Sequence, residues 1–381
     1  MTVRIDVSPS VLDWALSVTQ ADRGSLQRRF AVAGWQTGQA RPTLNQLRDF
    51  ARAAGVPFGY LVLADPPRWT LPIADFREGF EQRTVPSANL IAVVSQSQRR
   101  QEWYREYALG IGIEPLSFVG SAAAAEPFQA AATIRAALHS DVSERYGGWD
   151  DTRKVMLRNF EALGGLTVAT SVVGNNSHRR LDEKEFRGFT LVDQVAPLVF
   201  VNTSQTVNGQ IFTLAHEFAH VWRGISGIGD EEPRSRHRGV IERWCNAVAS
   251  EILVPRAELE RRYPEVEGLP LPDLLDRLAH DFRCGTLVVL QALRDAGLRR
   301  FESFDTTYDR ESQRLATLAN ATTSAGGDSY NVYPFRVGER LSRALISDAL
   351  EGRTSIADAM QLMSMKSLST FDEYAKRLGA A

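Results

Sequence analysis

The sequence predicts an α+β protein that is mostly helical, with a small sheet in its central part and helical regions on both sides. Three observations support this fold class. Apolar residues recur at helical spacing around residues 211–222 and in several other stretches. Short apolar runs at 166–173, 189–191 and 198–201 have the length and composition of strands. The chain before residue 67 and after residue 306 shows helical patterns.

The composition is that of an ordinary soluble globular protein, with 381 residues, 44% hydrophobic and 24% charged. Forty-four basic residues against forty-six acidic ones leave the chain nearly neutral, so net charge indicates neither nucleic-acid nor membrane binding. Cys245 and Cys284 lie in apolar helical patterns and are expected to be buried free thiols. The start lacks an apolar segment, and no stretch approaches the roughly 18 apolar residues of a membrane span. We therefore expect a cytoplasmic protein with no membrane partner.

Residues 1–67 are expected to form a small helical domain. The segment 35–38, followed by residues 42–44, resembles the end of an XRE-type helix-turn-helix. Between Leu26 and Trp35, however, there are only eight residues. That is too few for the rest of a positioning helix, a turn and a full recognition helix. The sequence thus predicts a trimmed XRE-like domain, in which protein interaction or a structural role is favoured over DNA binding.

Residues 68–127 are expected to form a linker and then a long helix at 87–109. The linker contains a compact unit at 71–77, in which Asp75 and Arg77 are expected to pair and fix the linker rather than take part in catalysis. The arginines of the long helix are expected on its exposed side: Arg99, Arg100 and Arg105.

Residues 128–305 are expected to form the central α+β domain. Helices are predicted at 131–138 and 152–163, and Gly164-Gly165 is expected to end the second one. The strand-like runs follow, and two further helices come after them. An edge of such a sheet could accept an extended polypeptide as an additional strand.

The strongest motif lies on the first of those later helices, in the order His216-Glu217-Phe-Ala-His220. Residues four apart lie one above the other on a helix, so His216 and His220 can offer imidazole nitrogens to one zinc ion. Glu217 lies beside them and is expected to act as the general base. The apolar residues of the helix form a stripe roughly opposite the histidines, which predicts one face in the core and the other facing a cleft.

A third ligand is expected from the next helix, which offers Glu242 and Glu251. The two are nine residues apart, about half a turn in angle, so only one of them can face the zinc ion. We favour Glu242, because it lies one turn before Asn246 and on the side of Ala249, whose small side chain lets the two helices approach closely. If Glu251 is not a zinc ligand, its carboxylate is expected to be solvated or to cap a helix.

After the ligand helix, a helix at 271–280 and a second one ending near residue 297 are expected to brace the site. Residues 306–381 are expected to form a C-terminal helical domain, polar at first and then with helices near 336–350, 355–364 and 369–378. This last part carries no chemical motif. Its expected role is recognition of a partner or cover for the central domain.

Together these stretches resemble the ImmA/IrrE family of zinc metallopeptidases. The resemblance rests on the strand 198–202, the helix with His216, Glu217 and His220, and the stretch from Glu242 through Asn246 to Pro255. It implies a zincin-like metallopeptidase domain with His216, His220 and Glu242 as zinc ligands and Glu217 as base. The chain departs from the family pattern at two packing positions: Cys245 and Val248, where alanine and phenylalanine are usual.

We therefore expect a zinc-dependent endopeptidase that acts on a protein substrate. Members of the family cleave helix-turn-helix repressors, which implies a transcriptional repressor or the product of an adjacent gene as substrate, in stress or mobile-element regulation. The alternative is an antitoxin-like or regulatory protein that binds a neighbouring-gene partner or DNA, with a vestigial zinc site. An intact Glu217 favours catalysis, because a structural zinc site needs no general base.

Overall fold

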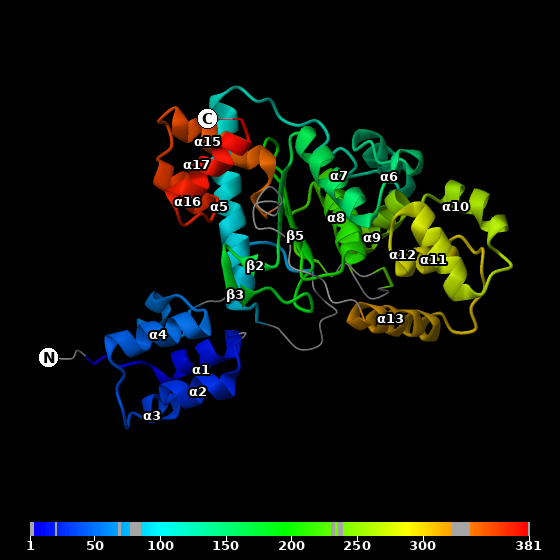
Figure 1. Ribbon diagram of the computed structural model, residues 1–381. Coiled ribbons are helices and arrows are strands. Elements are labelled where there is room, and N and C mark those ends of the chain that lie inside the picture. Colours follow the sequence, from blue (N-terminus) through cyan, green and yellow to red (C-terminus); the bar gives the residue numbers. More distant parts are fainter. Residues whose placement is uncertain are drawn as a thin grey trace. The chain divides into compact units, whose positions relative to one another are not determined.

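The computed structural model divides into two compact units (Figure 1). The smaller unit comprises Met1–Pro72, Glu81–Gln96 and Val172–Leu181, and the larger one comprises Ile73–Phe80, Ser97–Ser171 and Asp182–Ala381. The structure describes residues 4–19, 21–67, 70–76, 85–229, 233–234, 239–321 and 336–379. The expected boundaries at 67/68, 127/128 and 305/306 remain predictions, and one helix, Phe304–Ala321, crosses the last of them.

The smaller unit is a helical cluster around its own apolar core. Its third helix is only five residues long, and Val32 and Trp35 on it are buried. The trimmed XRE-like domain remains a prediction. Its hairpin is tied to the long helix, because Arg179 donates to Oδ1 of Asn89 at 2.9 Å. Its elements are α1 (Pro9–Val18), α2 (Arg23–Phe30), α3 (Val32–Gln36), α4 (Leu44–Ala54), η1 (Phe58–Val62), the first part of α5 (Ala88–Gly110), β2 (Val172–Val173) and β3 (Asn176–Arg180).

The larger unit is built around a three-stranded sheet in the order β1-β5-β4. Strand β5 (Leu198–Asn202) is central, parallel to β1 (Leu166–Thr170) and antiparallel to β4 (Gly188–Leu191). All residues of the three strands are buried, so helices or loops must cover both faces. The apolar run at 166–173 is not one strand as predicted. It ends at Thr170, and the next two residues pair in the hairpin of the smaller unit.

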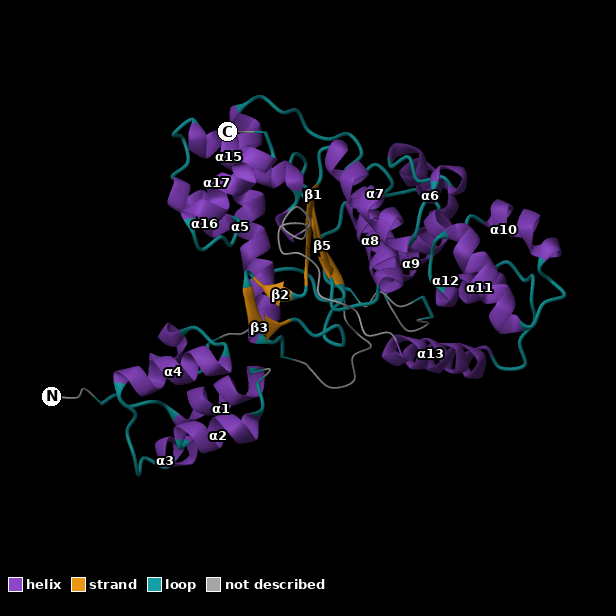
Figure 2. Cartoon of the chain, in the orientation of Figure 1, coloured by secondary structure: helices purple, strands orange, loops and turns teal. Residues whose placement is uncertain are grey.

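Helices lie on both sides of this sheet (Figures 1 and 2). On one side, α8 (Val207–Arg223) contacts β4 and β5, α7 (Trp149–Ala162) contacts β1, and α9 (Val240–Leu253) packs between α8 and α6 (Pro127–Ala137). On the other side lies residue Gln101 of α5, whose side-chain amide donates to the carbonyls of Leu191 and Ala196.

Further helices follow the ligand-bearing helix and complete the unit. Two of them, α10 (Arg256–Arg262) and α13 (Phe304–Ala321), occupy stretches that were not predicted to be helical. In the part of the chain that the structure describes, no helix is both long and apolar enough to cross a bilayer. The remaining elements are η2 (Val142–Glu144), α10 (Arg256–Arg262), η3 (Tyr263–Glu265), α11 (Leu271–Phe282), α12 (Thr286–Asp295), α13 (Phe304–Ala321), α15 (Glu339–Leu350), α16 (Ile356–Leu362) and α17 (Leu368–Arg377).

The prediction that all three arginines of α5 are exposed is wrong for Arg100. Its side chain is buried, and its guanidinium donates to the carbonyl of Leu362 at 2.8 Å and to the hydroxyl of Ser364 at 3.2 Å. Arg105 lies on the surface and pairs with Asp193 at 3.1 Å. Arg100 is buried because the C-terminal helices pack against α5. The sequence did not indicate that contact, so the burial of Arg100 could not be predicted.

Candidate metal centre

Helix α8 carries both histidines of the motif and begins and ends at clear signals. The hydroxyl of Thr206 accepts a hydrogen bond from the backbone of Gly209, and Gly224 ends the helix in the left-handed region at φ 79°. Every residue from 210 to 222 is buried. The sequence predicted one open face on this helix, but neighbouring segments cover that face as well.

Three potential metal donors converge at this helix. The Nε2 atoms of His216 and His220 are 3.1 Å apart. The two carboxylate oxygens of Glu242 lie 3.3 Å from Nε2 of His216 and 3.2 Å from Nε2 of His220. Ligand atoms held about 2.0–2.2 Å from a tetrahedral zinc ion lie about 3.3–3.5 Å from one another. The spacing of these donors therefore fits one zinc ion between them.

Three polar atoms of this cluster are buried, and no hydrogen bond to them is seen among the residues that the structure describes. These atoms are both carboxylate oxygens of Glu242 and Nδ1 of His220. Burial by itself would raise the pKa of the Glu242 carboxyl, but the adjacent imidazoles outweigh it and hold that pKa well below its usual range. An ionised carboxylate facing two imidazole nitrogens is a donor set that suits Zn²⁺.

Cys245 lies next to the same cluster. Its thiol and one nitrogen of each histidine are all within 4.8 Å of one another, so it is a second geometric candidate for the third ligand. Burial, and then the negative charges of Glu242 and Glu217, raise the pKa of this thiol well above its ordinary value. Because a thiol binds zinc as the thiolate, this environment favours the Glu242 carboxylate as the ligand.

Asn246 orients the first histidine. Its Oδ1 atom lies 2.9 Å from Nδ1 of His216, and an amide oxygen can only accept, so Nδ1 of His216 carries the proton. Nε2 is then the nitrogen of His216 that faces Glu242 and His220. Partners of this kind fix the tautomer and the ring orientation of metal-ligating histidines. The sequence pointed to Asn246 as part of a motif but gave it no role.

Glu217 is held by a strand on the sheet. Thr190 of β4 donates from its hydroxyl to Oε2 of Glu217 at 2.5 Å and also lies 3.1 Å from the backbone carbonyl of Glu217. Gly188 lies on the same strand, and a β-carbon there would be 2.8 Å from Oε1 of Glu217 and 2.9 Å from the carbonyl of Phe200. Only glycine at 188 leaves room for this carboxylate.

Glu251 lies away from the histidines, near the end of α9. Its carboxylate accepts hydrogen bonds from the backbone of Arg256 at 3.2 and 3.3 Å, at the first residue of α10. A carboxylate at the N-terminus of a helix satisfies a free N–H group and complements the helix dipole. The structure thus places Glu251 as a cap and places Glu242 beside the histidines.

Sequence reasoning missed three contributors to the site: Thr190, Gly188 and Gly229. A β-carbon on Gly229 would lie 2.4 Å from Oε2 of Glu242, so this glycine makes space for that carboxylate. Nothing in the local sequence links these residues to the histidine motif. Arg77 lies outside the described residues, so its predicted pairing with Asp75 remains a prediction.

An open groove lies beside the N-terminal half of α8. Phe212, one turn before His216, forms part of its wall, so the groove leads along α8 toward the cluster. Helices α12 and α13 supply most of its other apolar lining: Leu287, Val288, Tyr308 and Leu315.

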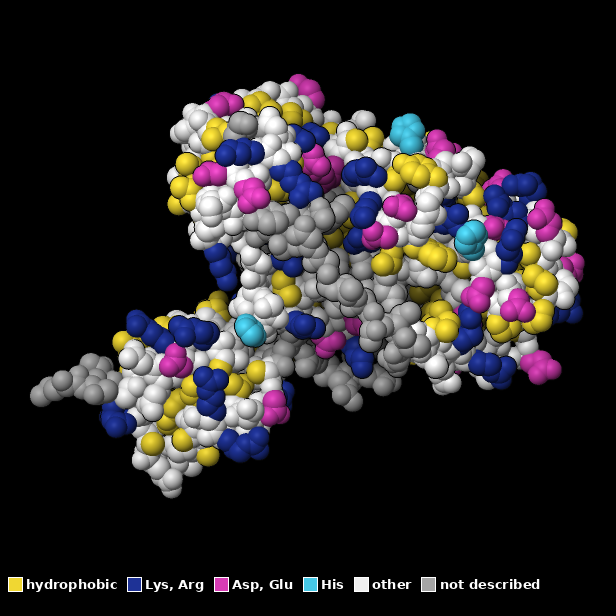
Figure 3. Space-filling view, viewed as in Figure 1, with side chains coloured by type: hydrophobic (Ala, Val, Ile, Leu, Met, Phe, Trp, Pro, Cys, Tyr) yellow, Lys and Arg dark blue, Asp and Glu magenta, His cyan; other side chains and the backbone are white. Residues whose placement is uncertain are grey.

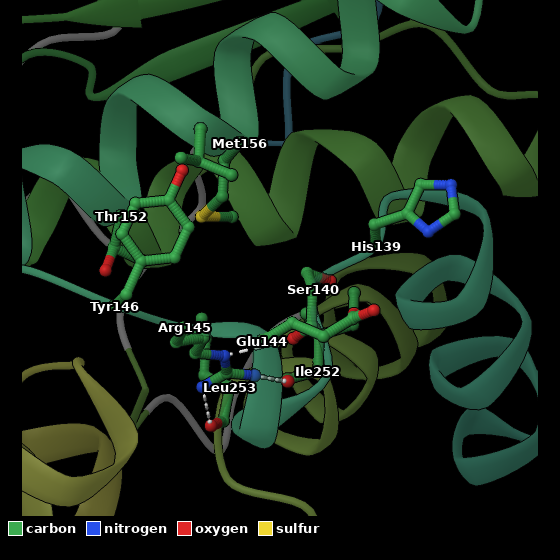
Figure 4. Close-up of a pocket in the computed structure, with 10 residues that line it drawn as sticks. His139, Ser140, Glu144, Arg145, Tyr146, Thr152, Met156, Ile252 and Leu253 are labelled. Carbon is green, nitrogen blue, oxygen red and sulfur yellow. Dashed lines mark hydrogen bonds between the residues drawn. The ribbon is translucent and has the colours of Figure 1, made fainter.

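On the face in Figure 3, basic and acidic side chains of the larger unit are interspersed and form no single basic surface. A second cavity between α7 and the end of α9 is lined by His139, Tyr146 and Met156 around the guanidinium of Arg145 (Figure 4). That guanidinium is already bonded to backbone carbonyls, so the cavity belongs to the packing of the helices.

Comparison with known families agrees with this location. Residues 161–294, about a third of the chain, match the model of the peptidase family M78, described as an IrrE N-terminal-like domain. Residues 337–377 match a second family, described as a domain of unknown function, DUF8813. No curated protein and no solved structure matches the chain. The first match contains every residue of the cluster and supports a peptidase-type domain in the ImmA/IrrE family.

Proposed function

We propose that this protein is a zinc-dependent endopeptidase that cleaves a protein substrate. The observation that carries this proposal is the convergence of His216, His220 and Glu242 at 3.1–3.3 Å, with Glu217 next to them. The exposed fractions of the four side chains are 0% for His216, Glu217 and His220 and 1% for Glu242. A general base beside three donors is the arrangement of a catalytic rather than a purely structural zinc site.

Zinc bound by these three side chains would supply an activated water molecule and polarise the scissile carbonyl. The residues of the chain carry out the other steps. Asn246 keeps Nε2 of His216 unprotonated, and Thr190 aims the carboxylate of Glu217. Glu217 takes a proton from the attacking water and passes it to the leaving amine. The buried surroundings exclude bulk water, which strengthens these electrostatic interactions.

The proposed substrate is a polypeptide, and the groove beside the N-terminal half of α8 offers it a surface that begins one turn before His216. By resemblance to the ImmA/IrrE family, the candidates are a helix-turn-helix repressor and the product of an adjacent gene. Cleavage would then relieve repression of stress or mobile-element genes. The trimmed N-terminal unit and the C-terminal helices would recognise the partner, and DNA binding is not favoured.

Metal content tests the ligand set. Elemental analysis should find about one zinc per chain in the wild type and in Glu251→Ala, and much less in Glu242→Ala. Glu251→Ala is the matched control, because it removes a carboxylate from the same helix. Zinc retained in Glu242→Ala and lost in Glu251→Ala would overturn the assignment of the third ligand. Zinc retained in both variants but lost in Cys245→Ala would assign the thiol instead.

Cleavage tests the general base. Wild type and Glu217→Gln should bind equal amounts of zinc, because Glu217 is not a ligand, but only the wild type should cut its substrate. The assay uses the products of neighbouring genes, with reduced and alkylated casein as an unfolded probe. Equal cleavage by both proteins would remove Glu217 from the mechanism.

One observation favours the alternative function, an antitoxin-like or regulatory partner-binding protein with a vestigial zinc site. The four side chains are buried, so no substrate reaches them in this conformation. Tight binding of a neighbouring-gene product by the wild type, unchanged in Glu217→Gln and without any cleavage, would establish that alternative.

A further inference from the structure

The linker segment 73–76 lies directly against the metal centre in the manner of an added strand. The carbonyl of Ala74 accepts a hydrogen bond from the backbone of Ile228 at 3.0 Å, and the backbone of Phe76 donates to the carbonyl of Ile228 at 2.8 Å. Asp75 is therefore paired in parallel with Ile228. Ile228 thus makes its two backbone hydrogen bonds to the residues on either side of Asp75, which is the hydrogen-bond pattern of two parallel strands.

The residues that accept this segment also continue the sheet. Gly227 exchanges two backbone hydrogen bonds with Thr190 of β4, at 3.0 and 3.1 Å. The order across this edge is therefore β4, then 227–228, then 73–76. Thr190 is the residue that holds Glu217, so the added strand lies at the edge nearest to the proposed general base.

The aromatic ring of Phe76 covers the second histidine. Its centroid is 6.2 Å from that of the His220 imidazole, and the two rings are nearly parallel, at 11°. The ring also fills the space that glycine leaves at position 227. A β-carbon there would lie 2.4 Å from Cε2 of Phe76. The backbone pairing and the ring contact together hold residues 73–76, an extended polypeptide with one aromatic side chain, against the site.

We propose that the backbone edge of Ile228 is the surface on which the substrate polypeptide pairs, and that residues 73–76 occupy it as an internal stand-in. The partner that fits is an extended polypeptide with an aromatic side chain over His220. A substrate has to displace the segment before it can pair with Ile228 and place a side chain over His220. This inference rests on the proposed function. It adds the class of substrate, an extended polypeptide, and the segment of the chain that competes with the substrate, residues 73–76.

The first experiment measures access to the site. Two opposite changes should both release the segment: Phe76→Ala removes the ring, and Gly227→Ala inserts a methyl group where the ring lies. Each should speed loss of zinc from the full-length protein to a chelator by about 5-fold. Phe76→Ala should also speed cleavage of alkylated casein, whereas Gly227→Ala should not, because its methyl group takes the place of the substrate's aromatic side chain. Gly268→Ala is the control, because a methyl group there meets nothing within 4 Å and should change neither rate.

The second experiment restores the occupant from outside. A synthetic peptide with the sequence of residues 70–76, Thr-Leu-Pro-Ile-Ala-Asp-Phe, should slow zinc loss from Phe76→Ala back toward the wild-type rate. The same peptide ending in alanine should not. About millimolar peptide is needed, since a tethered segment has an effective concentration of that order. Phe76→Tyr keeps an aromatic ring and should behave as the wild type.

The outcomes separate this inference from the function on which it rests. Suppose that the wild type binds one zinc ion and that Glu217→Gln is inactive, as the proposed function requires. If Phe76→Ala and Gly227→Ala then lose zinc at the wild-type rate, only the proposal that residues 73–76 occupy the substrate site is overturned. Faster zinc loss in both variants, with the two peptides equally without effect, would also overturn it, because loosening of the site would then explain the rates. A wild type that binds no zinc would overturn both proposals.

Discussion

At the residue scale, the site depends on side chains that hold the reacting groups as much as on the donors. Thr190 is the clearest example, because its hydroxyl has two acceptors on the same residue, Oε2 and the backbone carbonyl of Glu217. The bond is buried and one partner is a carboxylate, so it is stronger than an average hydrogen bond. Thr190 therefore acts as a positioning residue for the proposed base.

Thr190→Val keeps the shape of the side chain and removes the donor. We expect kcat for casein cleavage to fall about 10-fold or more, consistent with the loss of about 1.5–3 kcal/mol for a hydrogen bond to a charged group. KM and zinc content should stay near wild type. Thr190→Ser, which restores the hydroxyl, should recover most of kcat. An unchanged kcat in Thr190→Val would show that Glu217 needs no such support.

At the element scale, two helices end at one partly buried arginine. Arg145 donates to the carbonyls of Ile252 and Leu253, where α9 ends, and to that of Phe282, the last residue of α11, each at 2.6 Å (Figure 4 shows the α9 end). The last carbonyls of a helix have no partner within it and carry its negative dipole end. Burial lowers the pKa of Arg145 to about 10, so the side chain remains a cation at neutral pH.

Arg145→Met keeps most of the apolar stem and leaves those carbonyls buried without donors. The free energy of unfolding should fall by about 3–5 kcal/mol, because several hydrogen bonds to a charged group are lost at once. Urea denaturation measures this. Arg158→Met, an exposed arginine on neighbouring α7, is the control and should change stability by about 0.5 kcal/mol or less. Similar losses in both variants would contradict the role of Arg145.

At the scale of the whole molecule, a carboxylate of the central domain helps to hold the C-terminal helices, in addition to the contacts of Arg100. Glu161, at the end of α7, accepts hydrogen bonds from the backbone of Glu339 and Arg340 at 3.1 and 3.2 Å, and from the hydroxyl of Thr167 at 2.5 Å. It thus caps α15 from a distant part of the chain. Burial outweighs these bonds and raises the pKa of Glu161 from 4.5 to about 7.

This raised pKa predicts a pH dependence of stability. Between about pH 4.5 and 7, the folded protein binds more protons at Glu161 than the unfolded chain, so the free energy of unfolding falls as pH rises. The contribution of Glu161 to the free energy of unfolding is fully present below about pH 4.5, and it is lost as the pH rises through about 7. Relative to Glu161→Gln, the wild type should lose up to about 3 kcal/mol between pH 5 and pH 8.

Urea denaturation of both proteins at pH 5, 6, 7 and 8 measures this difference. All other titrating groups are common to the two proteins, so their contributions cancel in the comparison. A constant difference between wild type and Glu161→Gln across the range would mean that Glu161 titrates normally. The same series would then assign the pH response of the protein to other groups.

The sequence by itself determined the fold class, which the structure confirms as mostly helical with a small sheet. It also brought His216, Glu217 and His220 together, because residues one and four apart on a helix are neighbours whatever the rest of the chain does. The predicted helices of the central and C-terminal parts follow the same local rule. Helices α10 and α13 were not predicted. The sequence of α10 is short and mostly charged, whereas α13 has Phe304, Tyr308 and Leu315 at helical spacing, so the same rule could have found it.

Tertiary structure decided what local rules leave open. The rotation of α9 against α8 places Glu242 at the histidines and Glu251 at the start of α10, and sequence spacing could show only that one of the two faces the site. Thr190 and Phe76 reach the site from a strand and a linker that are remote in sequence. Such contacts depend on how the sheet and the helices pack. The surfaces that pack are far apart in the sequence and contact each other only in the folded protein.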